Sequence, residues 1–596
     1  MPESPRLTGS GVLKLTIFCN GSEIDGAYKI ISVSVLKAVN RIPKAKIIIS
    51  DGDAAKGDFP ISNSDDFKPG AQIEIKAGYN SKADTIFKGI VIRHGIKISE
   101  RNSPSLVVEC SDEAVKMTAG RKNANYVDKK DSEIISAIIG KYQDLSASVD
   151  ATDTKYKELV QYYCTDWDYI ISRGDVNGLI TIVDDSSVSV KKPQTDGSAK
   201  LKVSYGQDII NFNAEIDALN QFASVKSVSW NLKDQAPAEQ KGKAPSLNKQ
   251  GNITPKDLAK VIGLDSLNLQ TAAPVEETGL KAWASAQLLK SGLASIKGSM
   301  SFQGNSLAKP GEIIEIDRVG DRFNGNIFVS AVYHNISEGN WITEAEFGLD
   351  SGWFAEKKDI TAPPASGFLP GIEGLHVGIV KKLDDDPEKE NKIQVTVPVM
   401  QAETEGVWAR LANFYATNGF GSFFIPEVGD EVVLGYFNND PCHPVILGSL
   451  YSSKNPPPYK LTPENFIKAI ITKTGIKIEF DDENKILTLE TPGKNSITIN
   501  DKAKSILIAD QNKNKTELNS SGITLDSPKD ITITSKGKVD ITGTGGVNLT
   551  SNADVKISGL NVNAEGKVGF TGKGSATAEV SASGTTTIKG GMVMIN

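Results

Sequence analysis

The carboxyl-terminal part of the chain repeats every eight residues. Because strand side chains alternate between two faces, an apolar residue, any residue and a second apolar residue put both apolar side chains on one face of a short strand. The residues between these pairs are mostly Lys, Asp, Asn, Ser, Thr and Gly, which suit exposed faces and tight corners. The repeat therefore predicts one short strand per octad. The pairs are Ile523/Leu525, Ile531/Ile533, Val539/Ile541, Val547/Leu549 and Val555/Ile557.

Looser copies extend the repeat from Ile476 to the end of the chain at Asn596. A unit this small cannot bury its own apolar face, so the pattern predicts a stacked β-solenoid or β-helix. The period leaves two arrangements open: one chain winding by itself, or three chains interlacing on the sides of a triangular prism. One apolar pair per strand is a thin core for a lone solenoid, which favours three chains.

Charge and cysteine usage limit the class of protein. The net charge is −7 with acidic and basic residues interspersed, which gives no basic stripe of the kind that binds nucleic acid. The amino terminus lacks the pattern of a signal peptide, and no apolar run approaches the ~18 residues of a membrane span. Four scattered cysteines indicate assembly in a reducing compartment and predict neither a disulfide framework nor a zinc site: Cys19, Cys110, Cys164 and Cys442.

The sequence offers no constellation for catalysis, so we expect no catalytic residue, no metal and no cofactor. None of the four histidines lies near another histidine or a cysteine at ligand spacing. Asp384–Asp386 is typical of a solvated turn, and Gly543–Gly546 lacks the Lys of a phosphate loop. The histidines are His94, His334, His376 and His443.

From Leu13 to about Asp112 short strands alternate with Gly, Asn and Asp turns, which predicts an antiparallel barrel or sandwich. A helix is expected from about 131 to 142, with Asp131 or Ser132 capping its start. Further helices are expected from about Asp166 to Arg173 and around 279–291. The Ala, Pro, Gln, Lys and Gly of residues 234–252 predict an exposed loop, whose role stays open.

The second half divides into four parts. Residues 360–373 have the composition of a linker, and 374–451 carry five strands in a short space, as in a small OB-type barrel. A connector, 452–475, leads to the octads of 476–596. Residues 1–359 form the remaining domain. The fold class expected is mainly β, with barrels, short helices and a carboxyl-terminal β-helix.

Several segments resemble the spike proteins of contractile injection machines, the VgrG proteins of type VI secretion and phage tail spikes. Trp408–Pro458 is similar to their OB segment, joining Trp-x-Arg, Pro-Glu-Val-Gly-Asp-Glu-Val, Asp-Pro-x-x-Pro and Asn-Pro-Pro-Pro in one order. Pro69–Val91 and Lys309–Leu349 are similar to the two barrels of the family's tail hub. Val160–Arg173 is similar to a hub helix, with Tyr169 in its last aromatic position.

The resemblance implies a homotrimer whose hub domain meets a hexameric inner tube protein and baseplate proteins, and whose last strands interlace into a needle. It implies a bacterial protein that carries a PAAR-like tip protein and effector cargo and penetrates the target-cell membrane mechanically. The gap between Leu450 and Ile476 leaves no space for the lysozyme domain of some phage spikes, so a non-enzymatic spike is expected. The expected contact with the tip protein comprises Met592, Val593, Met594, Ile595 and Asn596.

Two other functions stay open. A receptor-binding or adhesin-like β-solenoid fibre would account for the octads and leave the OB and hub segments unexplained. A cell-wall hydrolase borne on the spike would need a catalytic insertion, which the sequence does not contain. Which contractile system the chain serves, and its target and cargo, are not determined by these residues.

Overall fold

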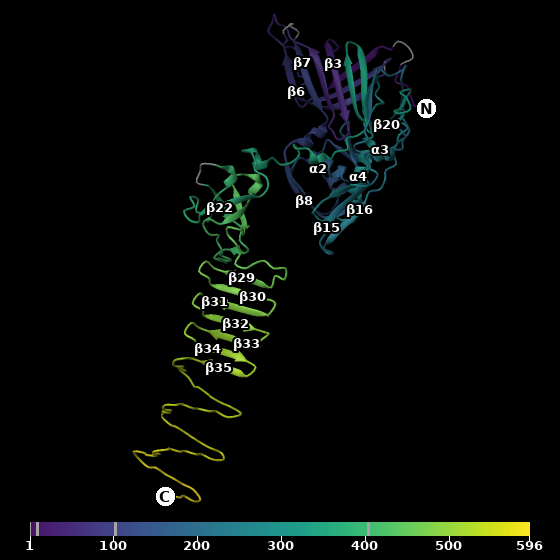
Figure 1. Ribbon diagram of the computed structural model, residues 1–596. Helices are drawn as coiled ribbons and strands as arrows, with labels where there is room; N and C mark the ends of the chain where they lie inside the picture. Colours follow the sequence, from purple (N-terminus) through teal and green to yellow (C-terminus); the bar gives the residue numbers. More distant parts are fainter. Residues whose placement is uncertain (1, 7–10, 81, 100–103, 402–405, 596) are drawn as a thin grey trace. The chain divides into compact units, whose positions relative to one another are not determined.

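The computed structural model describes residues 2–6, 11–80, 82–99, 104–401 and 406–595. The chain forms two compact units, Met1–Leu450 and Tyr451–Asn596 (Figure 1). Strands dominate both units and helices are few and short, which confirms the mainly β fold class.

A 13-stranded sheet is the sheet with the most strands in the described part of the first unit. It combines strands from before Asp112 with strands from after residue 296 and with two short strands between residues 201 and 216, because the long β20 pairs with β3 across a wide gap in the sequence. In pairing order the strands are β14 (Asn211–Ile216), β18 (Ile296–Gln303), β21 (Asn340–Phe347), β20 (Gly325–Ser337), β3 (Ile30–Ala38), β4 (Lys44–Ser50), β7 (Ser105–Ser111), β6 (Asp84–Lys97), β5 (Gln72–Tyr79), β1 (Leu13–Cys19) and β2 (Ser22–Glu23), with β19 (Ile313–Asp317) on β20 and β13 (Leu201–Ser204) on β19.

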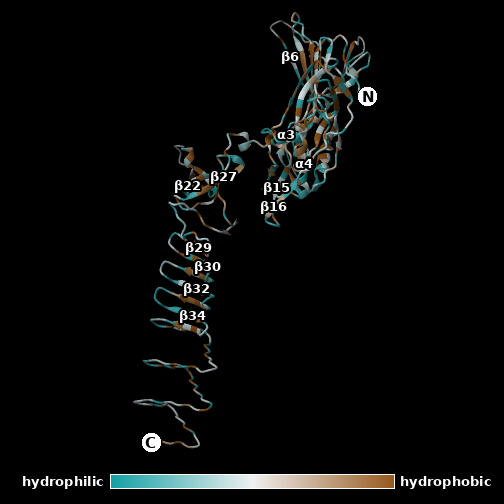
Figure 2. Ribbon diagram, turned by 45° about the vertical axis from the view of Figure 1, so that its right-hand side comes forward, coloured by the Kyte–Doolittle hydropathy of each residue, from teal (hydrophilic) through white to brown (hydrophobic). Residues whose placement is uncertain are grey.

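Two separate apolar cores lie against the strands of this sheet. Ile47, Phe87 and Val108 lie in the first core, and Phe302 and Val329 lie in the second. Alternate residues of each strand face these cores, as a period of two requires. Brown apolar stretches along the hub strands mark them in Figure 2.

Helices and small sheets fill the interval between the two halves of the large sheet. The helix predicted from 131 and the helix predicted from Asp166 are both confirmed, and so is the one around 279–291. The elements are η1 (Glu113–Thr118), α1 (Asp131–Ile139), α2 (Asp166–Asp175) and α4 (Glu277–Leu293), the ribbon of β8 (Lys122–Lys130) and β10 (Lys155–Cys164), and the sheet of β9 (Ser146–Val149), β11 (Ile180–Asp184) and β12 (Ser187–Lys191).

The predicted cap of α1 is wrong. Lys130 occupies the capping position, and the Glu133 carboxylate accepts a hydrogen bond from its backbone N–H at 2.9 Å. Asp131 instead receives two hydrogen bonds from Arg173 of α2, at 2.7 Å from Nε and 3.0 Å from Nη2. This ion pair joins α1 to α2. The Asp131 side chain is fully buried, so Arg173 is the cation that compensates its charge.

The loop predicted for residues 234–252 is also wrong in part. β16 (Ala236–Lys241) pairs with β15 (Val225–Asn231), which pairs in turn with β17 (Leu267–Gln270). The sequence of β16, APAEQK, gives no sign of a strand. Its Ala and Pro side chains are small, its other residues are polar, and apolar and polar residues do not alternate along it. The prediction also missed α3 (Pro255–Ile262), although Thr254 caps its start and Gly263 ends it at φ 72°.

The five-stranded OB barrel is confirmed. Its strands close in the order β22 (His376–Lys382), β23 (Ile393–Thr396), β24 (Val407–Leu411), β28 (Pro444–Ser449) and β27 (Glu431–Tyr436). Val395, Ala409 and Leu434 are fully buried in its core. A two-stranded hairpin of β25 (Ala416–Thr417) and β26 (Phe420–Gly421) extends from the barrel between β24 and β27.

The second unit contains one antiparallel sheet of seven strands, in which every strand pairs with its neighbours along the chain (Figure 1). Pairing starts at Ile467, ahead of the Ile476 expected from the repeat. The strands are β29 (Ile467–Ile471), β30 (Lys477–Asp481), β31 (Ile486–Glu490), β32 (Ser496–Asn500), β33 (Ser505–Ala509), β34 (Lys515–Asn519) and β35 (Gly522–Asp526).

Beyond β35 the outcome differs from the expectation of one strand per octad. The first pair, Ile523 and Leu525, lies in β35, but between Ser527 and Ile595 the structure assigns no strand. Those residues follow open turns of chain that run beside no other strand (Figure 1). A strand exists only where a second strand accepts its hydrogen bonds, and one copy of the chain supplies no such partner there.

The Asp131–Arg173 pair gives a test of the helical layer. We expect Arg173→Met to lower the free energy of unfolding by about 3–5 kcal/mol, because it leaves the Asp131 carboxylate buried without its cation. Lys157→Met is the control, since its ion pair with Asp128 is exposed and such pairs contribute about 0–1 kcal/mol. Urea unfolding followed by tryptophan fluorescence measures both, and equal losses would contradict the assignment.

Candidate functional site

One face of the seven-stranded sheet is mostly apolar, with Lys468 and Thr516 as its polar members, and we name it the apolar ladder face. Side chains directly opposite each other in register share a face, so the pairing places these residues in two rows that cross the strands. The first row is Ile470, Ile478, Leu489, Ile497, Ile508, Thr516 and Leu525, and the second is Phe480, Leu487, Ile499, Ile506, Leu518 and Ile523.

The opposite face of the same sheet is mostly polar. Its central positions are Glu479, Thr488, Thr498, Leu507, Glu517 and Thr524. On the apolar ladder face, in contrast, Ile497 is 40% exposed and Ile508 is 47% exposed. Large contiguous apolar patches are rare on soluble monomers and mark interaction sites. The apolar ladder face therefore needs a cover that this unit does not provide.

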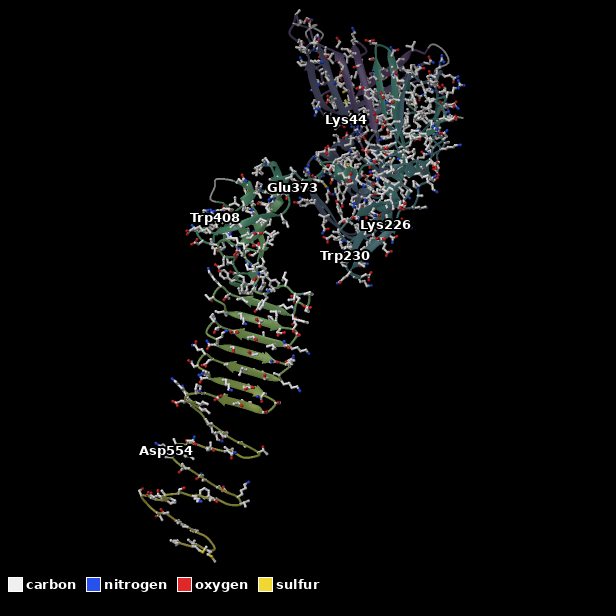
Figure 3. The ribbon with its side chains drawn as sticks, viewed as in Figure 1. Lys44, Lys226, Trp230, Glu373, Trp408 and Asp554 are labelled. Carbon is white, nitrogen blue, oxygen red and sulfur yellow. The ribbon has the colours of Figure 1, made fainter. Side chains whose placement is uncertain are left out.

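The octads after β35 expose their apolar pairs in a regular way. The first member of each pair is 51–58% exposed and the second is 71–72% exposed, from Ile531 to Ile557. Asp554, which lies in one of the intervening turns, is labelled on the open chain in Figure 3. Because each octad exposes its apolar pair to the same extent, each pair would need the same kind of surface to cover it.

An aromatic hairpin extends from the OB barrel. Phe414, Phe420, Phe423 and Phe424 are each at least 65% exposed, and Tyr415 packs edge-on against Phe420 with ring centroids 6.1 Å apart. These residues belong to the segment that resembles the spike family, and Figure 3 labels Trp408 of β24, which lies in the same segment. Exposed aromatic clusters are typical of protein interfaces. The barrel thus presents a second apolar surface.

A hollow of about 820 Å³ in the first unit lies beside a buried ion pair. Lys290 of α4 donates to both carboxylate oxygens of Asp175, at 2.7 and 2.8 Å, and to the carbonyl oxygen of Gly352 at 2.6 Å. The Asp175 carboxylate also accepts the backbone N–H of Phe354 at 2.9 Å. Each of these two charges is paired within the protein, so the cluster ties α4 to α2 and to the backbone at Gly352 and Phe354.

The histidines do not form a reactive site. His334 is buried, and its Nδ1 lies 3.3 Å from the Trp341 Nε1–H that donates to it and 2.9 Å from the Thr343 hydroxyl. Burial, together with the charge of Lys37, lowers the pKa of His334 to about 3. His94 contacts the Ser62 hydroxyl at 2.8 Å. Among the described residues, no group of three His, Cys, Asp or Glu side chains could hold a metal ion.

The remaining residues singled out from the sequence lie apart from one another. Asp386 accepts backbone hydrogen bonds from Glu388, Glu390 and Lys392, as in a solvated turn. Of the expected tip contact, Met592, Val593, Met594 and Ile595 are 49–87% exposed, whereas Asn596 lies outside the described residues. The aromatic hairpin was missed as a surface, although five aromatic residues between 414 and 424 were a visible signal.

The fold and these surfaces define a class of protein. Residues 376–451 match the family described as the type VI secretion system/phage-baseplate injector OB domain. The chain is therefore VgrG-like, with an injector OB barrel followed by a ladder of short strands. Residues 9–338, more than half of the chain, match the family described as the Alg8 N-terminal domain, and the chain belongs to that family.

Curated relatives match over short segments. The chain is 38% identical over 69 residues to the type VI secretion system spike protein VgrG3 of Vibrio cholerae, which is 12% of this chain and 7% of the relative. It is 38% identical over 63 residues to VgrG4b of Pseudomonas aeruginosa, 11% of this chain and 8% of the relative. The chain thus spans less than a tenth of the length of these relatives.

Solved structures of tail proteins are similar over a little more than half of the chain. The 43 kDa tail protein of prophage MuSo2 from Shewanella oneidensis has a TM-score of 0.43 at 8% identity, over 57% of this chain and 99% of that one. A tail protein from Neisseria meningitidis has a TM-score of 0.43 at 13% identity, over 58% and 98%. In the described part of the chain, no helix is both long and apolar enough to cross a membrane.

His334 predicts a pH dependence of stability. Its folded pKa of about 3 lies below its ordinary value of 6.5, so below pH 6.5 the unfolded state takes up a proton that the folded state does not. The contribution of the neutral His334 to the free energy of unfolding is fully present above pH 6.5 and decreases as the pH falls below it. Between pH 7 and 5 we expect the native chain to lose about 2 kcal/mol of unfolding free energy that His334→Gln retains. Parallel pH curves for the two chains, measured by urea unfolding, would contradict this prediction.

Proposed function

We propose that the chain is a non-enzymatic, homotrimeric spike of a contractile injection machine. The observation that carries the proposal is the succession of an injector OB barrel, residues 376–451, and a strand ladder with one exposed apolar face. Three copies can turn these faces inward and form a prism whose polar faces meet water. The VgrG relatives are named as spike proteins of type VI secretion, which supports this function.

The hub domain is proposed to join the spike to the rest of the machine. Each copy has two apolar cores against one continuous sheet, and we interpret each core with its strands as one barrel. Three copies would then present six barrels to a hexameric inner tube and to the baseplate. The interspersed charge of the chain fits recognition of proteins better than recognition of nucleic acid. Which contractile system is involved is left open.

The tip is proposed to carry a separate PAAR-like protein, with effector cargo. Met592 to Ile595 expose a short apolar segment to which such a cone-shaped protein could bind, and Asn596 completes the proposed contact. Puncture of the target membrane is mechanical in this proposal. A narrow stack of fully paired strands has no free lateral edge and resists unfolding along its axis.

The first test is the solution mass of the full chain and of a chain that ends before Ile467, measured by light scattering. We expect three chain masses for the full chain, because the apolar ladder faces cover one another. The shortened chain is expected to lose the resistance of the trimer to detergent. A full chain of one mass with an intact β spectrum would contradict the proposal and favour an adhesin-like solenoid.

The apolar ladder face provides a matched pair of variants within one strand. In β32, Ile499 lies on the apolar ladder face and Thr498 on the polar face. We expect Ile499→Lys to weaken the trimer by at least a hundredfold in its midpoint concentration, because three charges would be buried together. Thr498→Lys is expected to leave the mass unchanged. Equal effects of both variants on light scattering would contradict the inward orientation.

The tip contact is tested by Met594→Asp in the trimer. We expect loss of binding to a purified PAAR-type protein, measured by calorimetry, because a charge replaces an exposed apolar side chain at the contact. Asp554→Asn, a change in a turn far from the end of the chain, is the control and is expected to bind as before. Unchanged binding by Met594→Asp would show that these residues are not the contact.

A further inference from the structure

Arg121, the residue just before β8, joins the ribbon of β8 and β10 to the chain that follows residue 358. Its guanidinium donates to the carbonyl oxygens of Tyr163, Asp359 and Ile360, at 3.0, 3.1 and 3.1 Å. The same group lies over the Tyr163 ring, 5.8 Å from the ring centroid. We name this set of contacts the Arg121 clasp. It holds the point at which the segment 360–373 begins.

Tyr163 has a backbone conformation that is rare for an aromatic residue. Its φ is 39°, and it lies in a bulge, because the pairing of β10 with β8 shifts register between Gln161 and Cys164. The side-chain oxygen of Asn123 accepts the Tyr163 N–H at 2.8 Å. Backbone strain of this kind persists only where the surrounding structure imposes it. Here the strained residue presents its carbonyl oxygen to Arg121, so the clasp depends on the bulge.

A second anchor holds the chain a few residues before the clasp. The N–H of Phe354 donates to the buried Asp175 carboxylate at 2.9 Å. Between this anchor and the clasp the chain is coiled, since η2 (Phe354–Glu356) is followed by a turn in which Ile360 donates its N–H to the Lys357 carbonyl at 3.3 Å. A coiled segment spans less than an extended one, so chain length is stored between the two anchors.

A third anchor ties the far end of the connecting segment to the OB barrel. The Asn438 side chain donates to the Ser366 hydroxyl at 3.0 Å, and the Ile372 N–H donates to the Asn439 carbonyl at 2.8 Å. Both asparagines belong to the connection between β27 and β28. Of the segment whose composition predicts a linker, residues 361–365 are the part between the clasp and the barrel anchor.

The clasp determines how far the OB barrel can move from the hub domain. With the clasp closed, the tether runs from Ile360 to Ser366, and when fully extended it spans at most about 20 Å. With the clasp open, the free chain begins at Phe354 and spans at most about 40 Å. Release of the contacts of one side chain therefore about doubles the length of the tether.

We propose that the Arg121 clasp is a releasable latch that stores chain length between the hub domain and the OB barrel. This inference goes beyond the proposed spike and does not depend on how many copies assemble. Under tension the hydrogen bonds to Asp359 and Ile360 break before the Phe354 anchor, because water can reach the exposed Asp359 carbonyl whereas Asp175 is buried. Opening also lets Tyr163 leave its strained conformation.

Trypsin reports on the latch in the full chain, because Lys357 and Lys358 lie between the second anchor and the clasp. Both lysines are exposed, and a protease cuts them when the segment opens locally. Arg121→Met keeps a long side chain and removes the three hydrogen bonds. The matched control is Arg93→Met, which removes another arginine whose ion pair with Glu109 is exposed.

We expect Arg121→Met to raise the rate of cleavage after Lys357 and Lys358 by about tenfold or more, because proteolysis follows the population of the open segment. Arg121→Lys keeps the charge but lacks the planar fork that reaches several carbonyls, so an intermediate rate is expected. Arg93→Met is expected to match the native chain. Mass spectrometry locates each cut, and hydrogen exchange of residues 354–361 is expected to rise in the same order.

Equal cleavage of Arg121→Met and the native chain would overturn the inference, and so would equally fast cleavage of the Arg93→Met control. If cleavage rises throughout the hub domain in both Arg121 variants, the residue supports the fold of the hub and the latch is wrong. If only Arg121→Met unfolds, the local rate in Arg121→Lys decides. Light scattering of the same samples tests the proposed trimer separately, because an open clasp is expected to leave the mass unchanged.

Discussion

A β-strand with one apolar side needs two things from its surroundings: a neighbour for its backbone and a cover for its side chains. The large sheet of the first unit satisfies both needs internally, because it packs against two cores that bury Phe87 and Phe302 completely. In the second unit the backbone is paired only from Ile467 to Asp526. Its apolar side chains are uncovered both there and beyond Asp526. This deficit makes the carboxyl-terminal unit the part of the chain that has unpaired backbone and uncovered apolar side chains.

The charged residues of the first unit serve to hold its layers in place. Arg173 joins α2 to α1 through Asp131, and Lys290 joins α4 to Asp175 and to the backbone near Phe354. Buried ions of this kind cost free energy to desolvate and are retained only where every group is paired. They define a fixed arrangement of helices and small sheets. The surfaces that remain unsatisfied are apolar, as suits assembly.

The sequence predicted the OB barrel and three of the four helices, because those segments carry strong local signals. It missed β16, since Ala and Pro in Ala236–Lys241 give no alternation and the strand exists through its pairing with β15. It also missed α3, whose Thr254 and Gly263 signals lie in a polar stretch. The cap of α1 was misassigned because Asp131 has a distant partner, Arg173, that local rules do not reveal. Of the candidate surfaces, the octads were foreseen and the aromatic hairpin was not.

Turn length decides which kind of strand pairing the second unit can adopt. Alternating turns of five and four residues return the chain on itself, so each strand meets the next one within the same copy. The two-residue connection between β34 and β35 interrupts this alternation, and from Thr524 onward eight residues separate equivalent positions without exception up to Lys556. The apolar pairs are the same type before and after this point, so side-chain chemistry does not distinguish the two regions. The path of the backbone distinguishes the two regions. Turns that all bend in the same direction wind a chain around an axis, whereas turns that alternate in direction fold it back and forth.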